Sequence, residues 1–213
     1  YGPNLDLIKK NLKKNTKIVI FVDCGSNSSK IINFLKKNNI EVLIIDHHHI
    51  NNKLPSTLNI INPMKNPKDY TGQNICAAAL TFYLIYLLNN KLKKKINLYD
   101  FLFFALLGTI CDLMPLRHTN KHISKFALNK FSRVENPGIK QLLNLLSLKR
   151  SISFTDISYS IGPMINSPGR IKDANLCVEL LCSNNLNKIK KIVKEIQILN
   201  IKRKKIENFC TNL

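Results

Sequence analysis

Two short apolar runs near the start of the chain have the length and composition of buried β-strands. Lys17 to Val22 (KIVIFV) and Glu41 to Ile45 (EVLII) are rich in β-branched residues, as is typical of parallel strands covered on both faces. Between them, residues 28–38 carry apolar side chains near helical spacing. The pattern predicts a strand, a crossover helix and a second parallel strand. We therefore expect an α/β fold with a Rossmann-like parallel sheet and crossover helices.

Most of the remaining chain has the hydrophobic spacing of helices. Residues 51–70 hold three prolines among Asn, Ser and Thr, which predicts a surface loop. Helices are predicted over residues 73–88, 98–111, 121–132 and 137–146. Residues 155–166 fit a short helix or a strand, and the pairs Gly162-Pro163 and Pro168-Gly169 predict a break followed by a turn. The second half should thus be mostly helical.

The last predicted element is a long amphipathic helix. From Asn187 to about Asn208, apolar residues recur through a lysine-rich background that contains no Pro or Gly. A long helix in this position is typical of a connector between domains. We expect residues 186–213 to form such a connector.

The formal net charge of +20 favours a polyanionic partner, because clustered Lys and Arg release counterions from phosphate backbones on binding. Nucleic acid fits this charge. The alternative is a chain rich in Lys, Asn and Ile throughout, in which most lysines only solvate the surface. Runs such as Lys91–Lys95 and Lys202–Lys205 are more typical of solvated helix faces than of binding patches.

Neither secretion nor membrane insertion has support in the sequence. No signal segment opens the chain, and the apolar stretch from Phe101 to Met114 is shorter than the roughly 20 residues that a membrane-spanning helix needs. The 6 cysteines contain no CxxC pair, which argues against a zinc knuckle or a disulfide framework. We expect a cytoplasmic protein with reduced thiols and no membrane partner.

Metal-ligating residue types follow both predicted strands. Asp23 comes directly after the first strand and Asp46-His47-His48-His49 after the second, and ligands of open α/β sheets bind at that edge. Carboxylate with imidazole suits Mn²⁺, Fe²⁺ or Zn²⁺. Taken alone, Asp23 is more typical of the N-cap of the next helix. Three consecutive histidines after a buried strand are harder to explain structurally, since each is costly to bury without a partner.

Two further polar residues have both a structural and a functional interpretation. Asp112 interrupts an otherwise apolar helix, where a buried carboxylate needs a cation or hydrogen-bond donors. The alternative is an exposed carboxylate at the helix end, before Pro115. Arg170 follows a glycine and suits bidentate binding of phosphate, or else a surface salt bridge.

Four segments together resemble one family. Val22-Asp23-Cys24-Gly25, one crossover before Asp46-His47-His48, resembles the signature of DHH-family phosphoesterases. Gly108–Leu116 (GTICDLMPL) resembles the family segment with a further metal-ligating Asp. Ile161–Arg170 (IGPMINSPGR) and the opening Tyr1–Asn4 resemble segments of RecJ-type exonucleases within that family. The resemblance covers nearly the whole chain.

The resemblance implies a role for each matching residue. Asp23, His47 and Asp112 match metal ligands, His48 matches the histidine that faces the scissile phosphate, and Asp46 would orient His47. The substrate phosphates would be approached by Asn166, Gly169 and Arg170. The implied cofactors are Mn²⁺ or Mg²⁺, two ions in the complete enzyme, which activate water for in-line attack on a phosphodiester.

Three departures from the RecJ pattern stand out. Met164 occupies a position that usually holds Arg, and His49 is an additional histidine that we interpret as a bystander. The family's Asp-x-Asp motif and its C-terminal domain do not occur in the chain. The implied organisation is a DHH phosphoesterase domain over residues 1–185, incomplete at its N-terminus, followed by the connector helix over residues 186–213, which would lead to a missing domain.

The implied function is 5′-to-3′ exonuclease action on single-stranded DNA in recombination and repair, by a monomer with a single-strand-binding protein or a helicase as protein partner. One alternative is a DHH phosphodiesterase acting on short oligoribonucleotides, cyclic dinucleotides or pyrophosphate. Another is a non-catalytic nucleic-acid-binding relative, against which the intact ligands Asp23, His47 and Asp112 argue.

Overall fold

The chain folds into two compact units. A computed structural model describes residues 2–51, 54–55, 57, 59–65, 74–147 and 151–211. The first unit comprises residues 1–96 and 104–125, and the second comprises residues 97–103 and 126–213. No helix in the described part of the chain is long and apolar enough to cross a membrane.

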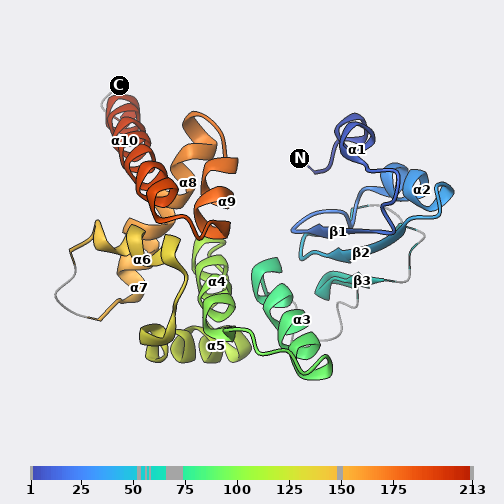
Figure 1. The fold of residues 1–213 in the computed structure, drawn as a ribbon, viewed down its shortest axis with the longest axis horizontal. Coiled ribbons are helices and arrows are strands. Elements are labelled where there is room, and N and C mark those ends of the chain that lie inside the picture. Colours follow the sequence, from blue (N-terminus) through green and yellow to red (C-terminus); the bar gives the residue numbers. More distant parts are fainter. Residues whose placement is uncertain are drawn as a thin grey trace. The chain divides into compact units, whose positions relative to one another are not determined.

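A parallel sheet in the order β1-β2-β3 organises the first unit (Figure 1). Strand β1 spans Ile18–Val22 and β2 spans Glu41–Ile45, with the crossover helix α2 over Ser29–Lys37 between them. The two strands pair in parallel, from Ile18 opposite Glu41 to Val22 opposite Ile45. The predicted strand, helix, strand unit is therefore confirmed.

The parallel register brings the ends of the strands to one edge of the sheet. The ladder continues one residue past each strand, because the N–H of Asp23 donates to the Ile45 carbonyl (2.9 Å) and the N–H of Asp46 donates to the Ile61 carbonyl (2.9 Å). The residues that follow β1 and β2 consequently leave the sheet side by side.

The core of the first unit lies between the sheet and two helices. Helix α1 spans Leu5–Asn11, and its N-cap Asn4 accepts hydrogen bonds from the N–H groups of Asp6 and Leu7. Figure 1 shows α1 and α2 on the same side of the sheet, with α3 (Ala77–Lys91) on the other side. The buried cluster beneath α1 and α2 contains Phe21, Ile31, Ile32, Leu35, Ile40, Val42 and Ile44.

The predicted loop over residues 51–70 holds regular structure that its sequence pattern did not predict. Ile60–Ile61 form strand β3, which pairs in parallel with β2, and Pro63–Lys65 form a turn of 3-10 helix. Two apolar residues are enough here because β2 leaves an edge free for pairing. Residues 66–70 of that prediction, Gln73 at the predicted start of the next helix, and Tyr1 lie outside the described residues.

The middle helices agree with the hydrophobic pattern and differ mainly at their ends. Helix α4 spans Leu98–Cys111 as predicted, while α3 runs to Lys91 rather than to residue 88. Helix α5 spans His118–Asn129, three residues earlier than predicted, and α6 spans Pro137–Asn144.

The break and turn predicted around residues 162–169 are wrong. A short helix α7 (Phe154–Asp156) leads through a π-helical turn (Ile157–Ile161) into helix α8 (Gly162–Ile171). Pro163 lies at the start of α8, directly after the π-helical turn. Pro168 cannot donate to the Met164 carbonyl, and the Ser167 hydroxyl donates to that carbonyl instead (2.8 Å).

The second unit ends with helices α9 (Asn175–Cys182) and α10 (Leu186–Thr211). Helix α10 confirms the predicted long amphipathic helix, and it packs against α6, α8 and α9 (Figure 1). Its buried face consists of Ile189, Ile192, Val193, Ile196, Leu199 and Asn200. Its role as a connector to a further domain stays a prediction.

Three helices that end in the first unit do so with the same backbone motif. The residue after the C-cap has a positive φ: 56° at Asn39 after α2, 51° at Lys93 after α3, and 54° at Leu113 after α4. At each end, this residue and the next donate their N–H groups back to carbonyls of the last turn, as in a Schellman motif. A left-handed conformation costs a residue with a Cβ atom about 1–2 kcal/mol relative to glycine.

We predict that Leu35→Ala lowers the free energy of unfolding by about 2–5 kcal/mol, because Leu35 is fully buried under the sheet and its loss leaves a cavity. Leu7→Ala, at an exposed position of α1, is the matched control and should change it by less than about 0.5 kcal/mol. Urea denaturation of both variants measures the difference. Equal effects would show that the core does not lie where α2 meets the sheet.

Candidate metal centre

Two loops at the edge of the sheet and the end of one helix supply the candidate site. Asp23 follows β1, and Asp46, His47 and His48 follow β2. Asp112 directly follows α4, and all five residues belong to the first unit. The loop after β1 turns sharply at Gly25, whose φ is 114° and where a Cβ atom would lie 3.1 Å from that of Phe21. Glycine is therefore required at this turn.

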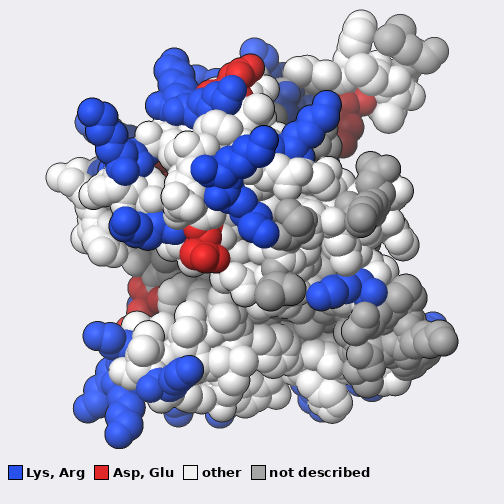
Figure 2. Space-filling view, turned by 90° about the vertical axis from the view of Figure 1, so that its right-hand side faces the viewer, with Lys and Arg blue, Asp and Glu red and all other residues white. Residues whose placement is uncertain are grey.

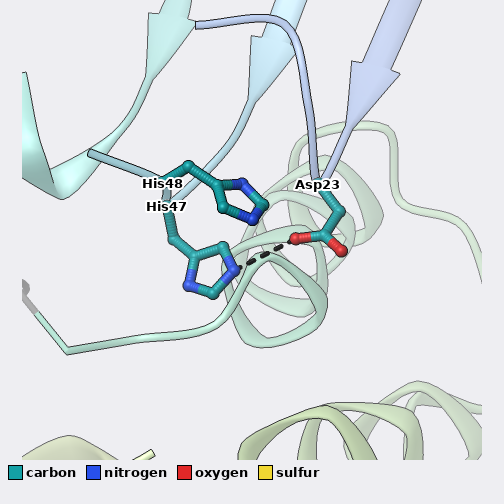
Figure 3. Close-up of side chains that lie close together, drawn as sticks. All are labelled: Asp23, His47 and His48. Atoms are coloured by element: carbon teal, nitrogen blue, oxygen red, sulfur yellow. Dashed lines mark ion pairs between the residues drawn. The ribbon is translucent and has the colours of Figure 1, made fainter. Parts of the chain in front are cut away.

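The structure brings the three predicted metal ligands together. The Nε2 atom of His47 lies 3.1 Å from Oδ1 of Asp23 and 3.7 Å from Oδ2 of Asp112. Asp23, His47 and His48 each offer one atom that could bind a metal, and these three atoms all lie within 4.8 Å of one another. Figure 3 shows the His47 ring pointing at the Asp23 carboxylate across the gap between the two loops. The geometry suits a cation that is shared between carboxylate and imidazole.

The electrostatics of this cluster favour a cation. Oδ1 of Asp23 is buried and accepts no hydrogen bond of good geometry, although His47 is close. Burial raises the pKa of Asp112, and repulsion from Asp23 raises it further. The pKa of His47 is also raised, chiefly by its contact with Asp23. A divalent ion bound by these groups would supply the missing partner of Asp23 and relieve the repulsion between the carboxylates. The residues therefore fit a divalent metal.

Asp46 has a different partner from the one that the sequence analysis predicted. Its Oδ1 atom contacts Nδ1 of the His48 ring at 2.7 Å. The same atom accepts a hydrogen bond from the backbone N–H of His47 (2.8 Å) but does not contact the His47 ring. The reason is local geometry: an Asp side chain turns back onto the N–H group two residues later, which places the His48 ring beside the carboxylate. Asp46 therefore orients His48, and the prediction that it orients the His47 ring is wrong.

Asp46 is fully charged at neutral pH. Burial by itself would raise its pKa, but the hydrogen bonds from the N–H of Ser26 and from His48 outweigh burial and lower the pKa to about 2. A charged carboxylate can only accept a hydrogen bond from the imidazole, so the proton of a neutral His48 lies on Nδ1. In this tautomer Nε2 is the unprotonated ring nitrogen of His48.

A layer of hydrogen bonds behind these residues was not predicted from the sequence. Asn62, directly after β3, is buried, and its Nδ2 atom donates to Oγ of Ser26 (2.8 Å) and to the carbonyl of His48 (3.0 Å). Ser26 is also buried, and its N–H donates to Oδ2 of Asp46 (3.0 Å). Asn62 thus joins the loops after β1 and β2. The sequence signal for it was weak: a polar residue directly after two isoleucines.

His49 lies outside the cluster. Its side chain is exposed, and its carbonyl accepts a hydrogen bond from Nδ2 of Asn27 (2.9 Å). This placement agrees with the interpretation of His49 as a bystander.

The predicted substrate-binding residues lie on α8 in the second unit. Asn166 and Arg170 are exposed and lie one helical turn apart, so they share one face of α8. Gly169, next to Arg170, is also exposed. Met164 is buried, with 6% of its surface exposed, so the residue that replaces the usual Arg belongs to the core here. Contact of the exposed residues with phosphate stays a prediction.

Comparisons with known proteins agree with this geometry. A family model described as "DHH family, N-terminal domain" matches residues 3–109. The single-stranded-DNA-specific exonuclease RecJ of Salmonella typhimurium is 27% identical over 219 residues, which cover 97% of this chain and 38% of that protein. RecJ of Bacillus subtilis is 27% identical over 213 residues, which cover 100% of this chain and 26% of that protein. The chain thus spans well under half the length of these relatives.

The fold is also similar to solved structures. A crystal structure of exonuclease RecJ bound to manganese matches with a TM-score of 0.87 at 23% identity, covering 99% of this chain and 53% of that one. A structure of RecJ from Thermus thermophilus in complex with Mn²⁺ matches with a TM-score of 0.85 at 23% identity, covering 97% of this chain and 31% of that one.

We predict that Asn62→Ala lowers the free energy of unfolding by about 1–3 kcal/mol, because it leaves Ser26 and the His48 carbonyl without their donor. Since the loop after β2 then loosens, affinity for Mn²⁺ should fall about 10–100-fold. Chemical denaturation and calorimetric Mn²⁺ titration measure these effects.

Asn59→Ala, at an exposed position just before β3, is the matched control and should change neither quantity. If Asn62→Ala also has no effect on Mn²⁺ affinity, the hydrogen bonds of Asn62 do not position the metal ligands.

Proposed function

Because this chain belongs to the DHH family, we propose that the protein is a metal-dependent phosphodiesterase that removes nucleotides from the 5′ end of single-stranded DNA during recombination and repair. The observation that supports this proposal most is the meeting of Asp23, His47 and Asp112 around one point at the carboxyl edge of the sheet. The relatives that match nearly the whole chain bear the name of a single-strand-specific exonuclease.

We propose Mn²⁺ or Mg²⁺ as the metal, held by Asp23, His47 and Asp112. When bound, the ion would supply an activated water and would neutralise charge on the attacked phosphate. Carboxylate oxygens suit both ions, and the imidazole of His47 favours Mn²⁺ over Mg²⁺. The structures of RecJ with manganese match this fold.

His48 would act on the phosphate from the side opposite its contact with Asp46. The carboxylate of Asp46 fixes the ring and holds its Nδ1 proton, so Nε2 is the ring nitrogen that we propose acts on the phosphate. A neutral ring could accept a proton at Nε2, and a charged ring could donate a hydrogen bond from Nε2 to a phosphate oxygen. Either role requires the ring orientation that Asp46 imposes.

A nucleic-acid substrate agrees with the charge of the molecule. The formal net charge is +20, and Lys and Arg far outnumber Asp and Glu on the face seen in Figure 2. Arg170 on α8 would bind a phosphate through its guanidinium, with Asn166 and Gly169 beside it. Such contacts position a strand without reading its sequence, as an exonuclease requires.

Other properties of the proposed enzyme rest on the resemblance to RecJ. We propose that it acts as a monomer in the cytoplasm, where its DNA substrate is found, and that it works with a single-strand-binding protein or a helicase. Size-exclusion chromatography with light scattering tests the monomer. Pull-down with purified single-strand-binding protein tests that partner.

We predict that His47→Ala in the full-length protein lowers kcat by about a thousandfold or more at saturating DNA, because it removes a ligand of the ion that stabilises the transition state. DNA binding should largely survive. Release of nucleotides from a 5′-labelled single-stranded oligonucleotide, with Mn²⁺ present, measures the rate.

His49→Ala is the matched control in the same loop and should leave kcat unchanged. Equal rates for His47→Ala and wild type would refute the metal-ligand role. Faster turnover of oligoribonucleotides or cyclic dinucleotides than of DNA would instead change the proposed substrate.

We predict that Arg170→Ala weakens binding of single-stranded DNA and makes the slope of log K against log salt shallower by about 0.7, the value expected for one lost phosphate contact. Because Arg170→Ala leaves the metal ligands intact, its activity should recover at high DNA concentration. Arg203→Ala is the control, since its guanidinium is already paired with Glu207 (2.6 Å). An unchanged salt slope for Arg170→Ala would show that Arg170 does not bind a phosphate of the DNA.

A further inference from the structure

Leu113, the residue directly after the candidate metal ligand Asp112, is unusually exposed. Its side chain is 88% exposed, the largest exposed fraction among the large hydrophobic residues in the described part of the chain. Leu116, in the same loop, is 46% exposed. Consecutive Cα atoms are about 3.8 Å apart, so the backbone of Leu113 lies at the edge of the candidate metal centre.

The backbone of Leu113 is also unfavourable for leucine. Its φ of 54° is the left-handed conformation of the Schellman motif that ends α4. The equivalent positions after α2 and α3 are occupied by Asn39 and Lys93, and asparagine adopts this conformation more easily than leucine or lysine. Glycine is the most common residue at such a position. Folding alone would thus favour Gly or Asn over an exposed leucine at residue 113.

The loop that carries Leu113 is held in place. Asn120, which is only 4% exposed, donates from Nδ2 to the Pro115 carbonyl (3.0 Å) and to the Asn74 carbonyl (2.6 Å). The N–H of Met114 is bonded back to the Thr109 carbonyl (3.0 Å). Leu113 is therefore presented to solvent on an anchored loop, between two residues whose backbone N–H groups are both bonded to α4.

We propose that Leu113, with Leu116 of the same loop, contacts the apolar face of the base or sugar of the nucleotide next to the scissile phosphate. This inference rests on the proposed function and extends it to the substrate's non-phosphate part. The metal ligands can hold only the phosphate. A leucine next to Asp112 offers a surface against which any base or deoxyribose can pack, with no requirement for a particular sequence. The energetic cost at residue 113 is then explained by binding rather than by folding.

The test uses Leu113→Gly in the full-length protein with Mn²⁺ and a 5′-labelled single-stranded oligonucleotide. We expect KM to rise about tenfold, as for the loss of one leucine-sized apolar contact. Tm should stay equal or increase, because glycine relieves the left-handed conformation. The Mn²⁺ concentration for half-maximal activity should not change, since Asp112 is intact. Leu113→Met, which keeps an apolar side chain, should retain a KM close to that of wild type.

Asn39→Gly is the matched control. It introduces glycine at the equivalent backbone position after α2, just before the start of strand β2 and away from the metal ligands, and should leave KM unchanged. An unchanged KM for Leu113→Gly would overturn the inference, as would a shift in the Mn²⁺ requirement, which would show that Leu113 acts through Asp112. A wild-type protein that does not degrade the oligonucleotide would contradict the proposed function itself. The two failures can be told apart, because a failure of the proposed function is already seen with the wild-type protein alone.

Discussion

The parallel, in-register pairing of β1 with β2 is the constraint on which the candidate site depends. Since Val22 lies opposite Ile45, the next residues of both strands leave the sheet at the same edge. Asp23 and His47 can then approach to 3.1 Å although they are far apart in sequence. Helix α2 maintains this register by burying Ile31, Ile32 and Leu35 against the sheet. The chemistry at the edge is thus a consequence of packing in the core.

The site itself is costly to the folded chain without a cation. Asp23 adopts a φ of 62°, its Oδ1 atom is buried without a hydrogen bond, and the nearby carboxylate of Asp112 has a raised pKa. By contrast, Asp46 is fully satisfied and has a pKa of about 2. The carboxylates of the site therefore lie in two different environments. Asp46 is charged and orients His48, whereas the environment of Asp23 and Asp112 favours a bound cation. Unfavourable conformations at Asp23 and Leu113 flank this same region.

Much of the fold could be predicted because strong local patterns determine it. The strands β1 and β2 and helix α4 are continuous apolar runs with clear ends, and their bounds agree with the pattern to within a residue. Strand β3 was missed because two isoleucines carry no periodicity, and its existence depends on the free edge of β2. Helix α8 was missed because Pro168 normally breaks a helix, and only the three-dimensional structure shows that Ser167 replaces the lost hydrogen bond.

In the candidate site, too, some features follow from local sequence patterns and others depend on the three-dimensional structure. The convergence of Asp23, His47 and Asp112 follows from the motifs and the sheet edge. The partner of Asp46 does not, because two histidines follow it directly in the sequence and the geometry of the turn decides which ring it contacts. Likewise Asn62 donates to the Ser26 hydroxyl and Asn120 to the Asn74 carbonyl, both distant in sequence, which no local pattern indicates.

Anomalous X-ray scattering at the manganese absorption edge, from crystals of the full-length protein soaked with MnCl₂, tests the metal centre directly. The expected result is an anomalous peak bonded to carboxylate oxygens of Asp23 and Asp112 and to Nε2 of His47, at distances of about 2.0–2.3 Å. The His48 ring should remain against Asp46. A peak elsewhere, with no metal bonded to Nε2 of His47, would contradict the assignment of these residues as metal ligands.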